Sequence, residues 1–387
     1  MDDALLRRAQ ELLARLIAFD TVSDRSNLAC IAFIEATLKA ADVRTWRAPN
    51  AAGDKATLLA MLGPVSEGGV VLSGHTDVVP VVGQVWSGDP FALRRIDDRL
   101  VGRGACDMKG FLAGVIASAE RSGGSGLKRP ILLAFSYDEE TTCLGSLDLI
   151  AMFGTAVPRP SLALVGEPTG LEVADSHKGV ATFMTHVEGR AAHSSQPSLG
   201  ADAVGVACDI GAEIARLGRA REAGAGDARF DPPHSTFHVG IVRGGEAVNV
   251  LAAECVLRWE FRALPGETAA DAEAQVRRFI DDIARPRLRR WIGDVDIVTT
   301  MEIDVPALKA AERGPGRTFA LGRARRNSTV AASFASEAGH FQRAGIETFL
   351  CGPGSIAQAH QPDEFVTIGQ IAGLLDILGR LWREMSE

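Results

Sequence analysis

Four short apolar runs recur along the chain, and each is bounded by Gly, Pro or acidic residues. They are Val70–Ser73, Ile131–Ser136, Leu162–Val165 and Thr348–Leu350. Their length and composition are typical of buried strands. Helical patterns such as Met108–Ser122 lie between them. This alternation favours an α/β fold, with a mixed, largely parallel sheet and helices on both of its faces.

The segment from about residue 177 to residue 304 has a different pattern, in which apolar and polar positions alternate. Its expected elements are strand, helix, two strands, helix and strand, at Ala181–Val187, Ala201–Leu217, Ser235–Val242, Glu254–Arg262, Ala269–Ala284 and Val295–Glu302. That order is typical of a small ferredoxin-like α+β domain. We therefore predict that domain at 177–304, inserted in a larger discontinuous domain formed by 1–176 and 305–387.

Composition and charge narrow the class of protein. A chain of 387 residues exceeds what one hydrophobic core usually supports, in agreement with two domains. The net charge of −8 does not indicate the positively charged surface that binding to nucleic acid requires. No stretch approaches the roughly 18 apolar residues of a membrane span, and Asp2–Phe19 has the pattern of a surface helix. We expect a cytoplasmic protein that acts on small molecules, without membrane or nucleic-acid partners.

Metal-binding residue types follow the predicted strands, where ligands bind in parallel sheets. His75 and Asp77 come directly after the first run, and their two-residue spacing places both on the same side of the chain. Asp77 could therefore orient the imidazole. Asp107 lies in the glycine-rich bend Gly102–Gly110, where the backbone can approach an ion. The alternatives are a surface pair for His75 and Asp77 and a helix N-cap for Asp107.

The second apolar run leads directly into three adjacent acids, Asp138, Glu139 and Glu140. Glu140 could be a metal ligand and Glu139 a general base, although a solvated acidic turn is the alternative. Glu167 follows the third run, and His360 follows the fourth. A mixed histidine and carboxylate set at one sheet edge suits zinc, cobalt or manganese. We expect two zinc ions that share one carboxylate, with cobalt as a possible substitute.

These residues resemble the M20 metallopeptidases over nearly the whole chain. The most specific segments are Gly74–Pro80, Gly102–Gly110, Asp138–Glu140, Gly166–Pro168, Gly189–Pro197 and Ser336–Phe365. The resemblance implies that Asp107 bridges two metals, one held with His75 and Glu167 and the other with Glu140 and His360. It also implies that Glu139 is the catalytic base, that Asp77 orients a ligand, and that the Asp107–Met108 peptide is cis.

The resemblance further implies that the inserted domain is a lid and dimerisation domain. His193, within Ala192–Ser195, would reach the active site of the partner in a homodimer and stabilise the oxyanion. Asn249 and Arg262 would contact the substrate, and Gly352 is a further substrate-binding position. From the residues alone, His193 could be an ordinary loop residue, and Asn249 and Arg262 could serve strand-end hydrogen bonding and surface charge.

The segment Ser336-Glu337-Ala338 resembles the deacetylase branch of this family, and Glu337 could pair with a cationic amino group of the substrate. The expected reaction is the hydrolysis of N2-acetyl-L-ornithine to L-ornithine and acetate, a step of arginine biosynthesis, by a water molecule that Glu139 activates. The alternatives are another amidohydrolase of the family, such as an N-acyl-amino-acid deacylase, a succinyl-diaminopimelate desuccinylase or a dipeptide-cleaving carboxypeptidase. A metal-stabilised binding protein without catalysis is the rival from another class.

Overall fold

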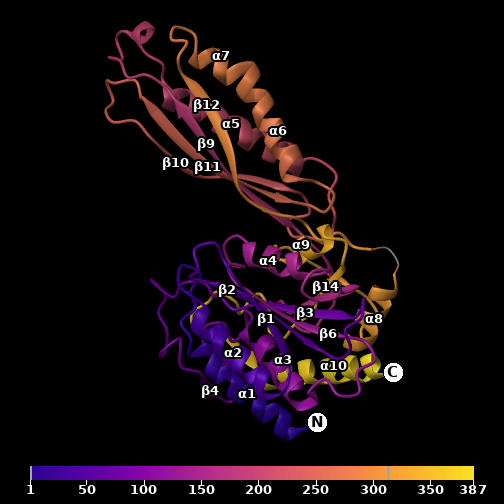
Figure 1. Ribbon diagram of the computed structural model, residues 1–387. Helices are drawn as coiled ribbons and strands as arrows, with labels where there is room; N and C mark the ends of the chain where they lie inside the picture. Colours follow the sequence, from indigo (N-terminus) through magenta and orange to yellow (C-terminus); the bar gives the residue numbers. More distant parts are fainter. Residues whose placement is uncertain (1, 312–313) are drawn as a thin grey trace. The chain divides into compact units, whose positions relative to one another are not determined.

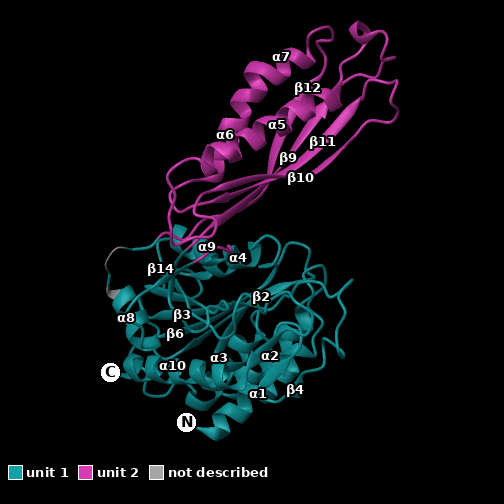
Figure 2. Cartoon of the chain, turned by 180° about the vertical axis from the view of Figure 1, so that it is seen from behind, with its two compact units in different colours: residues 1–176, 310–331, 336–387 teal, residues 177–309, 332–335 magenta. Residues whose placement is uncertain are grey.

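The computed structural model describes residues 2–311 and 314–387, which form two compact units (Figure 2). The first unit contains residues up to 176 together with 310–331 and 336–387, and the second contains 177–309 and 332–335. The return to the first unit comes five residues after the predicted boundary at 304/305, because His177 and Leu308 exchange backbone hydrogen bonds of 3.1 Å. The chain beyond the last strand of the second unit therefore still belongs to that unit.

An eight-stranded sheet forms the centre of the first unit, in the order β1-β2-β6-β3-β7-β14-β8-β13. The strands are β1 Arg44–Pro49, β2 Ala56–Leu62, β3 Val70–His75, β6 Ile131–Ser136, β7 Leu162–Val165, β8 Ala174–His177, β13 Val330–Ala332 and β14 Glu347–Leu350. The four central strands, β6, β3, β7 and β14, are parallel, whereas β1, β2 and β8 pair antiparallel. The predicted fold class is confirmed.

The four apolar runs of the sequence are these four parallel strands, and the strands are neighbours in the sheet. Their carboxyl ends therefore meet at one edge, and the residues that follow them come together there. The sequence did not identify β2, although all seven of its residues are buried. A continuous apolar run of that kind cannot be distinguished from a buried helical segment by periodicity alone.

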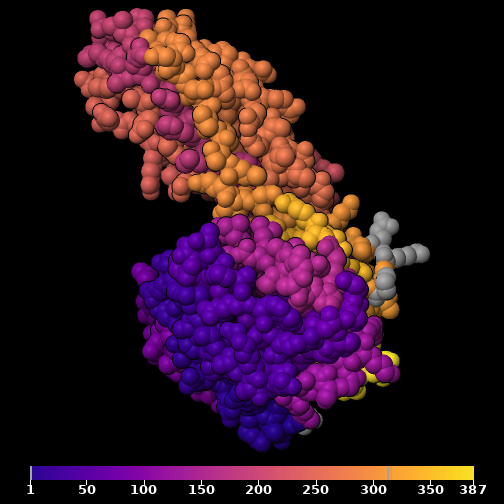
Figure 3. Space-filling view, viewed as in Figure 1, coloured from indigo at the N-terminus to yellow at the C-terminus, as the bar shows by residue number. Residues whose placement is uncertain are grey.

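Helices cover both faces of this sheet (Figure 1). One face carries α1 Asp3–Ile17, α2 Leu28–Ala40, α3 Lys109–Ser122 and α10 Ile368–Ser386, and the other carries α4 Leu144–Met152 and α9 Ala338–Arg343. The helix α8 spans Pro315–Ala324. A capping box of Thr367 and Gln370 fixes the start of α10. On the face of this unit seen in Figure 3, the surface is formed mainly by the N-terminal part of the chain.

A small antiparallel sheet connects two distant segments of the first unit. It has the order β15-β5-β4, with β4 at Arg94–Ile96, β5 at Arg99–Val101 and β15 at Phe365–Thr367. Phe365 pairs with Val101. This pairing brings the loop that contains His360 beside the bend that contains Asp107.

The second unit is a four-stranded antiparallel sheet of order β10-β11-β9-β12, with its helices on one face (Figure 1). The strands are β9 Gly179–Glu188, β10 Thr236–Gly244, β11 Glu254–Ala263 and β12 Asp296–Val305; the helices are α5 Ala203–Glu222, α6 Ala269–Phe279 and α7 Arg285–Leu288, with a π-helical turn at Ile280–Ala284 and a 3-10 turn at Pro197–Leu199. Phe183 and Trp259 stack in its core, with ring centroids 4.1 Å apart.

The helices of both units lack membrane-spanning character. Across residues 2–311 and 314–387, none combines the length and the apolar composition that crossing a bilayer requires.

Candidate metal centre and active site

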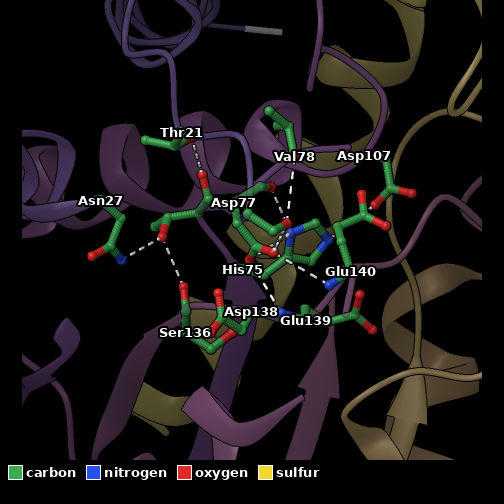
Figure 4. A network of polar contacts seen from close by, with 12 residues as sticks. Thr21, Asn27, His75, Asp77, Val78, Asp107, Ser136, Asp138, Glu139 and Glu140 are labelled. Carbon is green, nitrogen blue, oxygen red and sulfur yellow. Dashed lines mark hydrogen bonds and ion pairs between the residues drawn. The ribbon is translucent and has the colours of Figure 1, made fainter. Parts of the chain in front are cut away.

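His75, the last residue of β3, lies at the centre of a buried polar network (Figure 4). Its side chain is 1% exposed, and its Nε2 is 3.1 Å from Oδ1 of Asp107. Its Nδ1 is 2.9 Å from the backbone carbonyl oxygen of Asp77 and 3.6 Å from the Oδ1 of that residue. The nearer partner is thus the carbonyl, which also serves to orient metal-binding histidines.

Asp107 faces two histidines at once. Its Oδ2 is 3.3 Å from Nε2 of His360, while its Oδ1 contacts His75. The peptide bond to Met108 is cis. The helix α3 has Met108 at its N-cap position and no side-chain cap. Asp107 is therefore not a helix cap, and its two oxygens are arranged as those of a bridging ligand would be.

The acids after β6 complete one side of the cluster. Glu140 is 7% exposed, and its Oε1 and Oε2 lie 3.2 and 3.1 Å from Nε2 of His360. Two sets of side chains offer ligand atoms that all lie within 4.8 Å of one another, namely His75 with Asp107 and Glu140, and His75 with Glu139 and Glu167. The predicted division of ligands between two metals stays a prediction, but the predicted residues are brought together.

Two glycines place Glu167 at the end of β7. A Cβ on Gly166 would lie 2.0 Å from Cγ of Phe111 in α3, and a Cβ on Gly352 would lie 2.0 Å from the carbonyl oxygen of Gly166. Only glycine permits backbone and helix to approach this closely. Glu167 is 3% exposed, and among the described residues its Oε1 has no hydrogen-bond partner. Gly352, predicted as a substrate-binding position, thus packs against the backbone of Gly166 and of the predicted ligand Glu167.

Asp77 braces the segment that carries the acids. Its carboxylate accepts hydrogen bonds from Ser23 Oγ at 2.7 Å and from the backbone N–H groups of Glu139 and Glu140 at 3.2 and 3.3 Å. Sequence spacing had indicated only a contact with His75. The structure shows that the same side chain also fixes the predicted base.

Too much negative charge is buried in this cluster for the protein alone to balance. Burial, together with neighbouring carboxylates, raises the pKa of Glu139 and of Glu167 well above the ordinary value, and raises that of Glu140 to about 7. Hydrogen bonds that His360 donates to the carboxylates of Asp107 and Glu140 raise its pKa to about 10. Burial is the largest single influence on His75 and lowers its pKa, but the hydrogen bond to Asp107 and the charges of the nearby carboxylates together raise the pKa well above its ordinary value. Divalent cations would relieve this imbalance, and the donor set suits zinc, cobalt or manganese.

Glu337 lies close to the cluster but is fully buried. Its Oε1 accepts a hydrogen bond from Ser73 Oγ at 2.5 Å, and its Oε2 accepts one from Ser136 Oγ at 2.7 Å. Both serines belong to strands that carry the cluster, β3 and β6. Pairing of Glu337 with a substrate amine stays a prediction, and its present partners are these two hydroxyls.

The other predicted site residues belong to the second unit. His193 is exposed, and its Nδ1 is 2.8 Å from Ser195 Oγ. Asn249 is a neighbour, because the Ser194 N–H donates to its carbonyl oxygen at 2.9 Å. Arg262 lies on β11 and pairs with Glu260 at 3.1 Å. The candidate metal-binding cluster is built from residues of the first unit.

The sequence did not single out Arg103 and Glu364, which form a buried ion pair beside the cluster at 2.6 Å. Both lie within segments that carried the family resemblance. Nothing in a single sequence indicates, however, that residues 261 positions apart make this contact.

With this geometry in view, comparison with known proteins identifies the chain. The model of peptidase family M20/M25/M40 matches residues 71–384. The chain belongs to this family. The M20 match confirms the resemblance seen in the sequence and makes the protein a metal-dependent hydrolase.

Relatives of this M20 protein include an acetylornithine deacetylase of Photorhabdus laumondii, which is 32% identical over 380 residues, or 96% of this chain and 95% of the relative. An M20 metallo-carboxypeptidase of Sulfolobus solfataricus has a similar structure, with a TM-score of 0.75, 14% identity and coverage of 98% and 99%. A dinuclear metal-binding M20 peptidase of Bacillus subtilis has a TM-score of 0.69, 15% identity and 98% coverage of both chains. These structural likenesses show the fold.

Proposed function

We propose that this M20 hydrolase removes the acetyl group from N2-acetyl-L-ornithine and releases L-ornithine and acetate. The observation that carries the proposal is the buried cluster at the sheet edge, in which two histidines face a larger number of carboxylates. The deacetylase relative, 32% identical over nearly the whole chain, supports the choice of acyl group and amino acid. Release of L-ornithine would make this reaction a step of arginine biosynthesis, and the enzyme would act in the cytoplasm.

Two zinc ions fit the cluster. Asp107 would bridge them, because its two carboxylate oxygens face different histidines. His75 and Glu167 would complete one site, and the unpartnered Oε1 of Glu167 is available for that purpose. Glu140 and His360 would complete the other. When bound, the ions would polarise the acyl carbonyl and lower the pKa of water, and cobalt could replace zinc.

Glu139 is the proposed general base. It would take the proton of the attacking water and later give it to the leaving α-amine. Burial raises the pKa of its carboxyl well above that of an exposed glutamate. Asp77 fixes its position through the backbone N–H of Glu139.

The second unit would supply substrate contacts. His193 of the partner subunit would donate a hydrogen bond to the oxyanion, and Asn249 and Arg262 would hold the substrate amide and carboxylate. Exposure of His193 and Asn249 leaves both side chains accessible for such contacts. The enzyme would then be a homodimer, since each active site needs a residue from the neighbouring chain.

Turnover of a substrate panel tests this function. N2-acetyl-L-ornithine, neutral N-acetyl amino acids, N-succinyl-diaminopimelate and dipeptides would be compared by kcat/KM, with metal content measured on the same preparation. We expect the highest value for N2-acetyl-L-ornithine. Preference for another member of the panel would assign another M20 activity, and metal-loaded protein without turnover would indicate a binding protein. Unchanged preference in Glu337→Gln would contradict pairing of Glu337 with the ornithine amine.

A further inference from the structure

A continuous set of side-chain contacts joins the backbones of the two loops that present Asp107 and His360. Strand pairing of β5 with β15 aligns the two segments only as far as Val101 and Phe365. His360 lies five residues before that pair, and its side chain is 44% exposed. Its position beside Asp107 therefore depends on contacts other than the sheet.

Glu364 holds the Asp107 bend from one side. Its side chain is 1% exposed, and its Oε1 accepts the backbone N–H groups of Cys106 and Asp107 at 2.9 and 3.0 Å. Its Oε2 accepts a hydrogen bond from the Arg103 guanidinium at 2.6 Å. All of these bonds involve a buried carboxylate, and hydrogen bonds to a charged group are stronger than those between neutral groups. The backbone on which Asp107 stands is thereby tied to the loop of His360.

Arg103 and Gln84 continue this connection to His360 itself. The Arg103 side chain is fully buried, its guanidinium lies 5.0 Å from the ring centroid of Trp86, and it also donates to Oε1 of Gln84. Gln84 in turn donates from Nε2 to the backbone carbonyl oxygen of His360 at 2.8 Å. The resulting order is Asp107, Glu364, Arg103, Gln84, His360.

We propose that Glu364, Arg103 and Gln84 are positioning residues that hold Asp107 and His360 at the spacing needed to share one divalent cation. They do not touch the cluster through their own polar atoms, and they act only through the backbones of the two ligands. The proposal rests on metal binding by this M20 hydrolase and is independent of the acyl group it removes. Loss of such outer contacts typically weakens metal binding about 10- to 100-fold.

Metal titration of the apoprotein tests the proposal. Protein freed of metal by a chelator would be titrated with Zn²⁺ by calorimetry and with Co²⁺ by visible absorption, for wild type, Glu364→Gln and Gln84→Met. We expect Glu364→Gln to weaken binding of the cation that Asp107 and His360 share about 10- to 100-fold. Gln84→Met should weaken it by a smaller factor, because it removes one link and leaves the Asp107 bend held.

The matched control is Asp363→Asn, in the same loop. Asp363 contacts Ser87 and Arg94 at 2.9 Å each, and neither of these is a predicted ligand. Its replacement should leave metal affinity unchanged, and equal weakening in this variant would overturn the proposal. Gln84 is only half-buried, so Gln84→Met decides the matter if Glu364→Gln does not fold.

Thermal unfolding of the apoproteins separates positioning from stability. Variants that unfold at lower temperature but bind Zn²⁺ with wild-type affinity would show a purely structural ion pair and overturn the proposal. Wild-type protein that binds no cation would overturn the metal centre and this proposal together. Normal metal binding without deacetylation would contradict the proposed function alone.

Discussion

The two units hold their candidate site residues in opposite ways. In the first unit, His75, Asp107 and Glu167 are buried, and their neighbours fix them on strand ends. In the second unit, His193 and Asn249 are exposed on a loop pair. Burial of charge is costly unless it is compensated, so the first arrangement is suited to a cation. Exposure carries no such cost, and residues of the second unit gain a role only when substrate or a partner chain reaches them.

The largest effect expected within the first unit is loss of the general base. Glu139→Gln should lower kcat about 10²- to 10⁴-fold, because the attacking water would lose its proton acceptor. Metal content should stay that of the wild type. Steady-state kinetics with N2-acetyl-L-ornithine and metal analysis measure both. Glu172→Gln is the matched control, since the Glu172 carboxylate pairs with Arg326 outside the cluster. Near-normal turnover in Glu139→Gln would remove Glu139 from its proposed role.

The second unit should respond differently, with loss of turnover but not of metal. His193→Ala should lower kcat about 10²- to 10³-fold, the usual effect of removing one oxyanion donor. His186→Ala is the control, because His186 is a half-exposed histidine of the same unit, 3.6 Å from Glu254. Loss of metal in His193→Ala would contradict the assignment of metal binding to the first unit alone.

Mixing two inactive variants sharpens that experiment. A dimer of one Glu139→Gln chain and one His193→Ala chain retains one intact active site if His193 acts across the interface. After subunit exchange in an equal mixture, roughly a quarter of wild-type activity should return, since half of the dimers carry one site of two. No recovery, despite exchange shown by native mass spectrometry, would place His193 in its own chain's site or outside any site.

A smaller effect is expected from Gly352→Ala. The added methyl would meet the Gly166 carbonyl at 2.0 Å and displace the backbone next to Glu167. Zn²⁺ affinity should fall about 10- to 100-fold, as for other changes around metal ligands. Gly322→Ala is the control, because a Cβ there meets no atom within 4 Å. Normal affinity with altered KM would instead support the predicted contact of Gly352 with substrate.

Chelation should change stability rather than the chemistry, and the change should be confined to one unit. Zinc present at a hundredfold excess over its Kd stabilises the folded form by about 2.7 kcal/mol, and a chelator removes that contribution. Calorimetry should show the transition of the first unit moving to lower temperature, because its carboxylates lose their countercharge. A transition of the second unit that moved equally would indicate that the units unfold together.

Much of the first unit could be predicted because the site residues follow the carboxyl ends of parallel strands. The bounds predicted for Ile131–Ser136 and Leu162–Val165 are those of the structure. Of the acids that follow them, Glu139, Glu140 and Glu167 lie in the cluster, whereas Asp138 pairs with Lys55. Positions of Glu139 and Glu167 follow from this rule and from the pairing of neighbouring strands. No rule of spacing was needed beyond the alternation of strand and helix.

Other features could not be predicted because they depend on contacts between distant segments. The bracing of Glu139 by Asp77 joins residues 62 positions apart, and the Arg103–Glu364 pair joins residues 261 positions apart. His193 had no local signal, since an exposed histidine in a loop is ordinary. Only the resemblance to a family indicated a role for it, and that role stays a prediction.

The three hydrogen bonds of the Asp77 carboxylate have a consequence for attempts to redesign this enzyme. Through these bonds, the strand that ends in His75 is tied to the turn that presents Glu139, so that the two segments move together. An engineer who varies the ligand at position 75, or the residues beside it, will also move the base. Libraries aimed at new acyl groups are therefore better drawn from positions outside this pair of segments, such as Asn249, the proposed substrate contact of the second unit.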